Sequence, residues 1–446
     1  MTTSARASLH TLGCRLNHAE TAVLGEGLRQ RGFQLVEFGR PTDLLVLNTC
    51  AVTEDAERTS RYLIRKTLKH SPHAFVAVTG CYAQTGLEGL KRQGGIDLIV
   101  GHQFKLDLPS YLPPADALQK HASPDIRHTR TMSREDFELP YFGEPDSTRA
   151  PLKIQDGCSA MCSFCIIPFS RGHERSRRLE DILEEAHSLA ARGYREIVLT
   201  GVNLGQYLHH GHDLCSLLRQ LDRTAGLERI RISSIEPTTV SDELLDLLAG
   251  SAKFCPSLHI PLQSGDDQIL LAMNRRHTVR AYIGLIERAA AKIPHLGLGT
   301  DLMVGFPGET ESAFRNTLAV ATDLPFSYLH VFPYSPRPGT AAVRMKRAAP
   351  PATVRKRAEV LLDLGRAKRL AFHQQQIGTT VSVLFEASTQ DGYRQGCTPN
   401  FTKVAVAGSD DLRNQSKPIT ITAATERWAL GHPALEQPMI NSVIQL

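Results

Sequence analysis

The chain has 446 residues, of which 41% are hydrophobic, 22% are charged and nine are cysteine, and its formal net charge is +5. This length suits about three domains, and no apolar run approaches the roughly 18 residues of a membrane-spanning helix, so we expect no membrane contact. The first residues, MTTSARASLHTLGC, lack a basic segment followed by an apolar core. We therefore expect no signal peptide and a cytoplasmic location, where cysteines are ligands or free thiols rather than disulfides.

Residues 5–114 are predicted to form an open, parallel α/β sheet domain. Short apolar runs such as LLVLNTCAV and FVAVTGCYA have the character of buried strands. Stretches between them, such as EDAERTSRYLIRKTLKH, have helical spacing, and this alternation is typical of βαβ units. Residues 115–148 carry scattered charge and several prolines, which predicts a linker.

Residues 149–374 repeat the alternation of strands and helices more fully. Six candidate strands, each followed by a helical stretch, predict a partial (β/α) barrel whose working end is the C-terminal edge of its strands. Residues 375–446 change to short strands such as TTVSVLFEA and PITITAAT, which predicts a small all-β barrel. The expected fold class is therefore α/β, with an open sheet domain, a central partial barrel and a C-terminal β-barrel.

Three cysteines, Cys158, Cys162 and Cys165, lie within eight residues just after the first strand of the predicted central barrel. Structural zinc is one interpretation, but it needs four ligands and His173 is the only nearby candidate for a fourth. Compact all-cysteine sets also suit iron–sulfur clusters. Three thiolates on a four-iron cluster leave one iron free to bind a substrate or cofactor.

Cys14, Cys50 and Cys81 are far apart in sequence, yet each one ends a predicted strand of the first domain. Because the C-terminal ends of parallel strands meet at one edge of a sheet, these three cysteines can converge on one site. The alternative is that each is a small buried residue that happens to end a strand. The pattern favours a second three-cysteine cluster, whereas Cys215, Cys255 and Cys397 show no such arrangement.

The spacing of Cys158, Cys162 and Cys165, with the aromatic Phe164 before the last cysteine, resembles the radical S-adenosylmethionine (SAM) superfamily. The stretches TLGCRLNHAET, NTCAVTEDAERTSR and TGCYAQ resemble the methylthiotransferases within it. The C-terminal stretch DGYRQGCTPNFTKVAV looks like their TRAM domain, an RNA-binding module. The resemblance covers nearly the whole chain in the right domain order.

This resemblance implies two [4Fe-4S] clusters, SAM as cofactor, tRNA as substrate, and separate donors of electrons and sulfur. The free iron on Cys158, Cys162 and Cys165 would bind SAM, which a low-potential electron from a flavodoxin- or ferredoxin-like protein cleaves to a 5′-deoxyadenosyl radical. The cluster on the other three cysteines would hold the sulfur species. The radical would abstract hydrogen from an unreactive C–H bond, and methylthio would be joined to that carbon.

Short stretches such as ISSIEP and HVFPYSPRPGT resemble the bacterial subgroup that modifies C2 of N6-threonylcarbamoyladenosine at position 37, next to the anticodon of tRNA. The alternatives within the family are isopentenyladenosine of tRNA and an aspartate of a ribosomal protein. A radical enzyme that uses the N-terminal cluster only for electron relay is another alternative. A non-catalytic, metal-stabilised RNA-binding protein is an alternative of a different class.

Polar residues and glycines that follow the barrel strands would line the SAM pocket by this resemblance, although ordinary turn chemistry explains such residues as well. The expected cofactor-binding residues are Phe164, Thr200, Gly201, Asn203, Glu236, Gln263, Ser264 and Gly305. The segment 340–373 holds nine Lys or Arg against two acidic residues, which suits either a tRNA backbone or a solvated helix face. The expected RNA-binding residues are Arg355, Lys356, Arg357, Arg394, Phe401 and Lys403.

Overall fold

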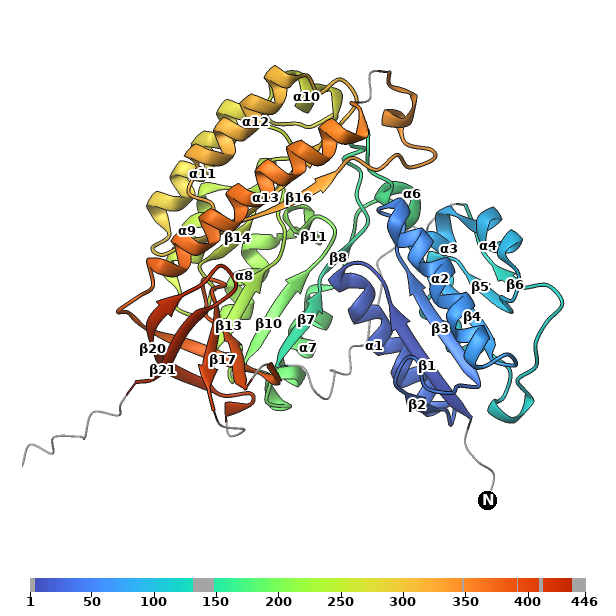
Figure 1. Cartoon of the computed structure of the whole chain (residues 1–446). Helices are drawn as coiled ribbons and strands as arrows, with labels where there is room; N and C mark the ends of the chain where they lie inside the picture. The colour runs from blue at the N-terminus through green and yellow to red at the C-terminus, as the bar shows by residue number, and fades with distance from the viewer. Residues whose placement is uncertain (1–4, 131–147, 347–348, 391, 409–411, 435–446) are drawn as a thin grey trace, which may run out of the picture.

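A computed structural model describes residues 5–130, 148–346, 349–390, 392–408 and 412–434 (Figure 1). Residues 5–130 contain a six-stranded, all-parallel sheet in the order β2-β1-β3-β4-β5-β6. Its strands are β1 (Arg6–Thr11), β2 (Gln34–Val36), β3 (Leu44–Thr49), β4 (Phe75–Gly80), β5 (Leu98–Val100) and β6 (Asp125–Arg127). Its helices are α1 (Arg15–Gln30), α2 (Glu54–His70), α3 (Cys81–Thr85), α4 (Leu87–Gln93) and α5 (Leu108–Tyr111).

Both faces of this sheet are buried. Successive side chains of a strand point to opposite faces, so neighbouring residues pack in different apolar clusters. In β3, Leu45 and Leu47 pack in one apolar cluster while Leu44 and Val46 pack in another. The near-continuous apolar runs seen in the sequence follow from this two-sided burial. Strand β6 lies in the segment expected to be a linker, and the short sequence DIR gave no strand signal of its own. The remainder of that segment, residues 131–147, lies outside the described residues.

Six parallel strands then form an open barrel from two three-stranded sheets, β13-β10-β7 and β14-β15-β16. Isolated parallel bridges, Ile230 with Phe254 and Ser234 with His259, join the two sheets. The barrel strands are β7 (Arg149–Lys153), β10 (Glu196–Thr200), β13 (Arg229–Ile232), β14 (Ser257–His259), β15 (Gly297–Val304) and β16 (Tyr328–Pro333). Short strands outside it are β8 (Gln155–Asp156), β9 (Arg175–Ser176), β11 (Leu208–His209) and β12 (His212–Asp213).

Helices cover the outside of this barrel, and a large apolar core lies between them and the strands (Figure 1). They are α7 (Leu179–Ala191), α8 (Leu214–Asp222), α9 (Asp242–Gly250), α10 (Asp267–Ala272), α11 (Val279–Lys292), α12 (Glu311–Asp323) and α13 (Pro351–Gln374). The short helix α6 (Ile167–Arg171) lies against α3 of the N-terminal domain instead. Side-chain oxygens cap several of the barrel helices: Asp213, Ser241, Thr278 and Thr310 each accept a hydrogen bond from the first turn. The sequence therefore marks these helix starts locally.

The C-terminal strands close into a five-stranded barrel in the order β17-β18-β19-β21-β20. They are β17 (Thr380–Gln390), β18 (Tyr393–Cys397), β19 (Lys403–Ala407), β20 (Ser416–Ala424) and β21 (Ala429–Pro433). This small barrel lies beside the N-terminal ends of β10 and β13 (Figure 1). The predicted fold class, an α/β chain with an open sheet, a partial barrel and a C-terminal β-barrel, is confirmed. Among the described residues, none of the helices is both long enough and apolar enough to cross a membrane.

Candidate active site

Cys158, Cys162 and Cys165 lie in the loop between β8 and α6, and all three are free, half-buried thiols. The loop turns sharply at Gly157, whose φ of +72° puts the place of a side chain 1.9 Å from the carbonyl oxygen of His173. Only glycine fits such a position without moving the backbone. The Ala160 N–H donates to Cys158 Sγ at 3.4 Å, and the Arg275 guanidinium lies 3.6 Å from Cys162 Sγ.

Cys14, Cys50 and Cys81 follow three neighbouring strands, β1, β3 and β4, and therefore meet at one edge of the N-terminal sheet. Glycines with positive φ, Gly13 at +99° and Gly80 at +97°, precede two of them. A Cβ on Gly13 would lie 2.9 Å from Cys50 Sγ, so the missing side chain lets the two cysteine segments approach.

The thiols of each set are one another's electrostatic neighbours. Burial raises the pKa of Cys50 to about 11 against a hydrogen bond from Val52, and the Cys81 and Cys14 thiols add to the rise. Burial likewise raises the pKa of Cys165 to about 12, with Cys162 and Cys158 adding to it. Such thiols stay protonated unless a cation binds them, and three soft sulfur donors are the chemistry that iron–sulfur clusters use. Both sets fit a cluster held by three cysteines.

A fully buried ion-pair network joins the segments that carry the two cysteine sets, and it was not predictable from the sequence. At its centre the Arg171 guanidinium donates to Glu20 Oε1 and to Asp156 Oδ1, both at 2.9 Å. Glu20 is in α1, which begins directly after Cys14, and Asp156 precedes Cys158 by two residues. Burial alone would raise the pKa of Glu20 and of Asp156, but Arg171 and the neighbouring lysines together outweigh it and hold both pKa values well below the ordinary range. These two carboxylates are therefore ionised.

Further cations complete the network. Lys153 Nζ lies 2.8 Å from both carboxylates, and Lys105 Nζ lies 2.6 Å from Glu20 Oε2. Arg175 Nη2 lies 3.5 Å from Asp156 Oδ2, so four cations face the two carboxylates. The electrostatic neighbours of Arg171 also include the Cys81 and Cys14 thiols.

Three of the expected cofactor-binding residues have buried polar atoms that bond to no other described residue. These atoms are Thr200 Oγ1, Asn203 Oδ1 and Gln263 Oε1. They lie at the C-terminal ends of β10 and β14, on the same end of the barrel as the Cys158 loop. Since an unpaired buried polar atom costs about 1–3 kcal/mol, the presence of all three at this end of the barrel fits a polar ligand such as SAM.

The other expected cofactor residues have partners within the protein. Glu236 forms a two-pronged ion pair with Arg275, at 3.1 and 2.5 Å. Ser264 Oγ lies 3.3 Å from Thr317 Oγ1, and Gly305 N–H donates to Glu309 at 2.8 Å. Phe164 packs edge-on against Phe306, with 6.5 Å between ring centroids. Gly201 packs so closely that a Cβ would lie 3.0 Å from Gln155 Oε1.

Gln155 is a functional candidate that sequence reasoning missed. Its Oε1 accepts from the N–H groups of Val202 and Asn203, and its Nε2 donates to the carbonyls of Asp156 and Gly157. One buried amide thus links the loop after β10 to the loop that carries the barrel cysteines. A glutamine in a strand carries no sequence signal of this kind, and its role depends on the strand order.

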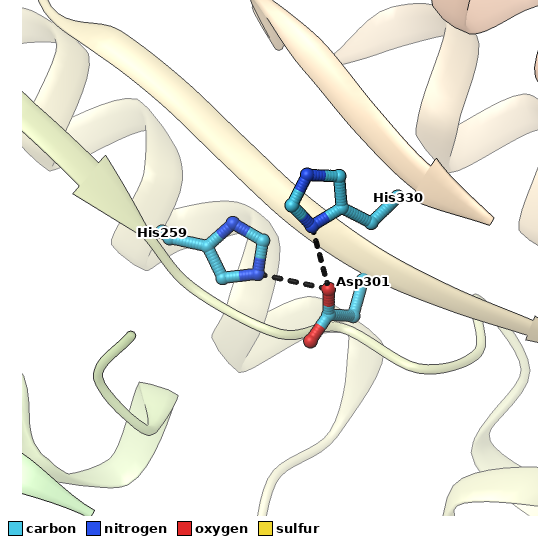
Figure 2. Close-up of side chains that lie close together, drawn as sticks. All are labelled: His259, Asp301 and His330. Carbon is cyan, nitrogen blue, oxygen red and sulfur yellow. Dashed lines mark ion pairs between the residues drawn. The ribbon is translucent and has the colours of Figure 1, made fainter. Parts of the chain in front are cut away.

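The inward-facing positions of the barrel are polar and charged. In β14, Leu258 belongs to the outer core, while the adjacent His259 points to the lumen and lies 2.9 Å from Asp301 of β15. Asp301 Oδ1 also lies 3.4 Å from His330 of β16, and Figure 2 shows the three side chains converging from the three strands. Other inward-facing charged residues are Arg149, Lys153, Glu196, Arg229 and Arg231. Closed barrels fill these positions with Val, Ile and Leu, so this lumen is suited to a polar ligand.

The C-terminal barrel closes the lower end of this lumen. Arg231 donates to the carbonyls of Thr398 and Pro399, and its guanidinium lies 5.1 Å from the centre of the Phe401 ring. Phe401, with φ of +67°, also lies 6.0 Å from the Tyr328 ring of β16. The ring expected to stack on RNA therefore packs inside the protein.

The remaining expected RNA-binding residues fall into two groups. Arg355 and Lys356 of α13 and Lys403 of β19 are exposed, and Lys403 lies over the ring of Trp428. Arg357 is buried and paired with Glu309 at 2.6 Å, and Arg394 is buried and donates to the Glu386 carbonyl. Buried guanidinium groups that already have partners are not available to phosphate, so the interface is expected on the exposed group alone.

Comparison with known proteins agrees with this arrangement of domains. The Radical SAM superfamily model matches residues 152–321, and the Uncharacterized protein family UPF0004 model matches residues 6–101. The threonylcarbamoyladenosine tRNA methylthiotransferase MtaB of Bacillus subtilis is 35% identical over 98% of this chain and 97% of its own length. The tRNA-2-methylthio-N(6)-dimethylallyladenosine synthase of Cereibacter sphaeroides is 36% identical over 86% of this chain and 88% of its own.

Among solved structures, the radical SAM methyltransferase TsrM of Kitasatospora setae, with cobalamin and a [4Fe-4S] cluster bound, has a similar fold. Its TM-score is 0.55 at 16% identity, with 87% of this chain and 82% of that chain covered. Membership of the radical SAM superfamily implies SAM and a [4Fe-4S] cluster as cofactors. With the identity to methylthiotransferases extending over almost the whole chain, the protein is an enzyme and belongs to the radical SAM methylthiotransferase family.

Proposed function

We propose that this enzyme adds a methylthio group to C2 of N6-threonylcarbamoyladenosine at position 37 of tRNA. The observation that carries the proposal is the pair of three-cysteine sets, one at the sheet edge and one at the barrel mouth, joined by one buried ion network. A reaction that joins sulfur to an unreactive carbon needs both a sulfur carrier and a radical source. The names of relatives at 31–36% identity support the substrate.

In this proposal Cys158, Cys162 and Cys165 hold one [4Fe-4S] cluster, and Cys14, Cys50 and Cys81 hold a second. When bound, the first cluster and SAM supply the one-electron chemistry that removes a hydrogen atom from a C–H bond. The second would carry the sulfur. We also propose two partners, namely a low-potential electron donor of flavodoxin or ferredoxin type and a separate sulfur donor. We propose that the reaction takes place in the cytoplasm.

In this proposal the protein's own side chains bind the cofactor, hold the two cysteine sets in place and exclude water. Thr200, Asn203 and Gln263 would direct their unpaired polar atoms to the cofactor, because no other described residue satisfies them. Arg171, with its two carboxylates, would hold the two cysteine sets at a fixed separation. The base of the C-terminal barrel would keep water out of the lower lumen, since Phe401 and the carbonyls beside it fill that end.

In the proposed tRNA interface, Arg355, Lys356 and Lys403 contact the phosphate backbone. They are exposed, and α13 contacts β20 of the C-terminal barrel, so one continuous surface can carry all three. The alternative substrate is isopentenyladenosine, which is favoured by the 36% identity to the dimethylallyladenosine synthase of Cereibacter sphaeroides.

Mass spectrometry of nucleosides from total tRNA, with and without this gene, tests the proposal. We expect the 2-methylthio form of threonylcarbamoyladenosine to disappear and its precursor to accumulate, and a copy of the wild-type gene to restore it. A copy with Cys50→Ala should fail to restore it, whereas Cys215→Ala, outside both sets, should succeed. Loss of the methylthio isopentenyl nucleoside instead would transfer the activity to the alternative substrate. No change in any tRNA nucleoside would contradict both.

A further inference from the structure

Tyr328, His259, Asp301 and His330 form a continuous hydrogen-bonded chain in the barrel lumen. Tyr328 Oη lies 3.1 Å from His259 Nδ1, His259 Nε2 lies 2.9 Å from Asp301 Oδ1, and the same oxygen lies 3.4 Å from His330 Nδ1. The Tyr328 ring crosses β15 at Gly299, where a Cβ would lie 2.0 Å from the ring. Glycine at this position therefore allows the chain to span three strands.

The partners of Asp301 assign the protons along this chain. Burial acts to raise the pKa of Asp301, but hydrogen bonds from His259 and His330 outweigh it, so the pKa falls below its ordinary value and the carboxylate is ionised. Both imidazoles then donate to Asp301, and Tyr328 donates to His259. His330 is left with Nε2 as a free acceptor, and its side chain is 60% exposed against 10% for His259.

Arg15 brings a positive charge to the same space from the N-terminal domain. It directly follows Cys14 at the start of α1, which contacts β7 of the barrel. Its electrostatic neighbours are barrel residues, namely Arg149, Arg231, Tyr328 and Glu196. The Arg15 side chain is exposed, and no carboxylate in the described part of the chain forms an ion pair with it. Two of these neighbours, Arg149 and Arg231, are cations, and Glu196 is already paired with Arg231, so the Arg15 guanidinium is suited to bind an added anion.

Arg15 and His330 would favour one of the two nucleosides in the relatives' names, threonylcarbamoyladenosine, over the other, dimethylallyladenosine. A threonylcarbamoyl arm carries a carboxylate and a hydroxyl, whereas a dimethylallyl arm is a hydrocarbon. Placing a hydrocarbon beside Arg15 and His330 would desolvate charged and polar atoms without replacing their hydrogen bonds. A carboxylate on Arg15 and a hydroxyl on His330 would satisfy both.

We propose that Arg15 binds the carboxylate of the substrate's N6 arm and that His330, held by Asp301, accepts a hydrogen bond from its hydroxyl. This rests on the proposed function, because it takes the threonylcarbamoyl arm as the ligand. Asp301 and Tyr328 are positioning residues here, acting through His259 and His330. Binding of the arm's carboxylate to Arg15 would also hold the reacting base near Cys14, because Arg15 directly follows Cys14 in the chain.

Binding of anticodon stem-loop RNAs that differ only at position 37 tests the proposal without turnover. The nucleosides are the threonylcarbamoyl form, its methyl ester, and the glycylcarbamoyl form, which keeps the carboxylate and lacks the hydroxyl. We expect the anaerobically prepared wild-type holoenzyme to prefer the acid over the ester by roughly tenfold or more. Arg15→Leu should abolish this preference, and Arg15→Lys should retain part of it. His330→Phe should abolish only the preference for threonylcarbamoyl over glycylcarbamoyl.

Arg29→Leu is the matched control, since Arg29 lies on the same helix, is half exposed and pairs with Glu26. Each variant is used only if its iron content equals that of the wild type, because Arg15 adjoins Cys14. Equal affinity of the wild type for acid and ester, or an acid preference that survives Arg15→Leu, would overturn the proposal. If the acid preference holds while cells without the gene keep the methylthio threonylcarbamoyl nucleoside, the substrate proposal fails and the carboxylate site remains.

Discussion

Cys50 is the residue on which the proposed second cluster depends most directly. Its sulfur lies against Gly13 and faces Cys14 and Cys81, whereas Cys215 packs in the apolar core of the barrel. We expect Cys50→Ala to lose about four of about eight iron atoms per chain while the cluster on the barrel cysteines persists. Iron analysis and Mössbauer spectroscopy of anaerobically purified protein measure this, with Cys215→Ala as control. An unchanged iron content in Cys50→Ala would show that this thiol holds no cluster.

At the residue scale, the sequence reveals side chains whose type and position are both unusual. A cysteine after each of three strands is such a signal, and these cysteines do meet at one edge of the sheet. Glu20 is an ordinary helix residue, and only the packing of two domains gives it its partners. Gln155 is an ordinary strand residue, and its partners depend on the loop after β10 lying beside it in the barrel. Arg355 and Arg357 look alike in sequence, yet the helix turns one to solvent and the other to Glu309.

At the scale of elements, the contact between the N-terminal sheet and the barrel carries a pH dependence. His102 is buried there, 3.3 Å from Asp156. Burial and the charges of Lys105 and Arg171 lower its pKa from 6.5 to about 4 despite the carboxylate. The unfolded chain then binds more protons than the folded one between these two values. Stability is fully present above about pH 6.5 and decreases as the pH falls toward about 4.

We therefore expect the free energy of unfolding of the wild type to fall by about 1 kcal/mol from this group between about pH 7.5 and about pH 5.5. His102→Gln removes the titrating ring, so this part of the decrease should be absent. His70→Gln, at an exposed ring, should leave the pH dependence as in the wild type. Denaturant unfolding at the two pH values measures the difference. The same decrease in wild type and His102→Gln would mean that another group titrates.

Strands and helices with strong local patterns were predictable, and contacts between elements were not. The caps and the apolar periodicity of the barrel helices depend on residues that are close together in the sequence. The loop around Phe401 was expected to bind RNA because its sequence resembles the TRAM domain. Its position below the barrel depends on Gly297, where a Cβ would lie 1.9 Å from the Asn400 carbonyl oxygen. A close approach between segments so far apart has no local signature.

At the scale of the whole molecule, the three modules surround one polar lumen. The N-terminal domain contributes Arg15 of α1 at the side of the lumen. The Cys158 loop lies at the mouth of the lumen, and the C-terminal barrel closes the base of the lumen. The order of the modules could be predicted from the sequence, but their mutual contacts could not, because buried ion pairs between domains have no periodic pattern. The substrate must therefore enter from the face that none of the three modules closes.

The cations available to a tRNA backbone are those that packing leaves exposed. Arg355 and Lys356 are adjacent on α13, exposed, and without an ion pair among the described residues. Replacing both by Gln should weaken tRNA binding at low salt and lower the slope of log K against log salt by roughly 1.5, since each phosphate contact releases about 0.7–0.9 counterion. The affinity should fall equally for every nucleoside at position 37, because these contacts are to the backbone.

The matched control is Arg65→Gln with Lys66→Gln, an exposed Arg-Lys pair on α2 of the N-terminal domain with the same change in charge. If α13 forms the interface, the α2 variant keeps the wild-type salt slope and only the α13 variant lowers it. Equal effects of the two variants would mean that tRNA responds to total charge. An unchanged slope in the α13 variant would place the backbone contacts elsewhere, and Lys403 beside Trp428 would then be the next pair to replace. The RNAs that differ at position 37 distinguish the two sites. Replacing Arg15 should change the preference among nucleosides, whereas replacing Arg355 and Lys356 should change the affinity for all of them.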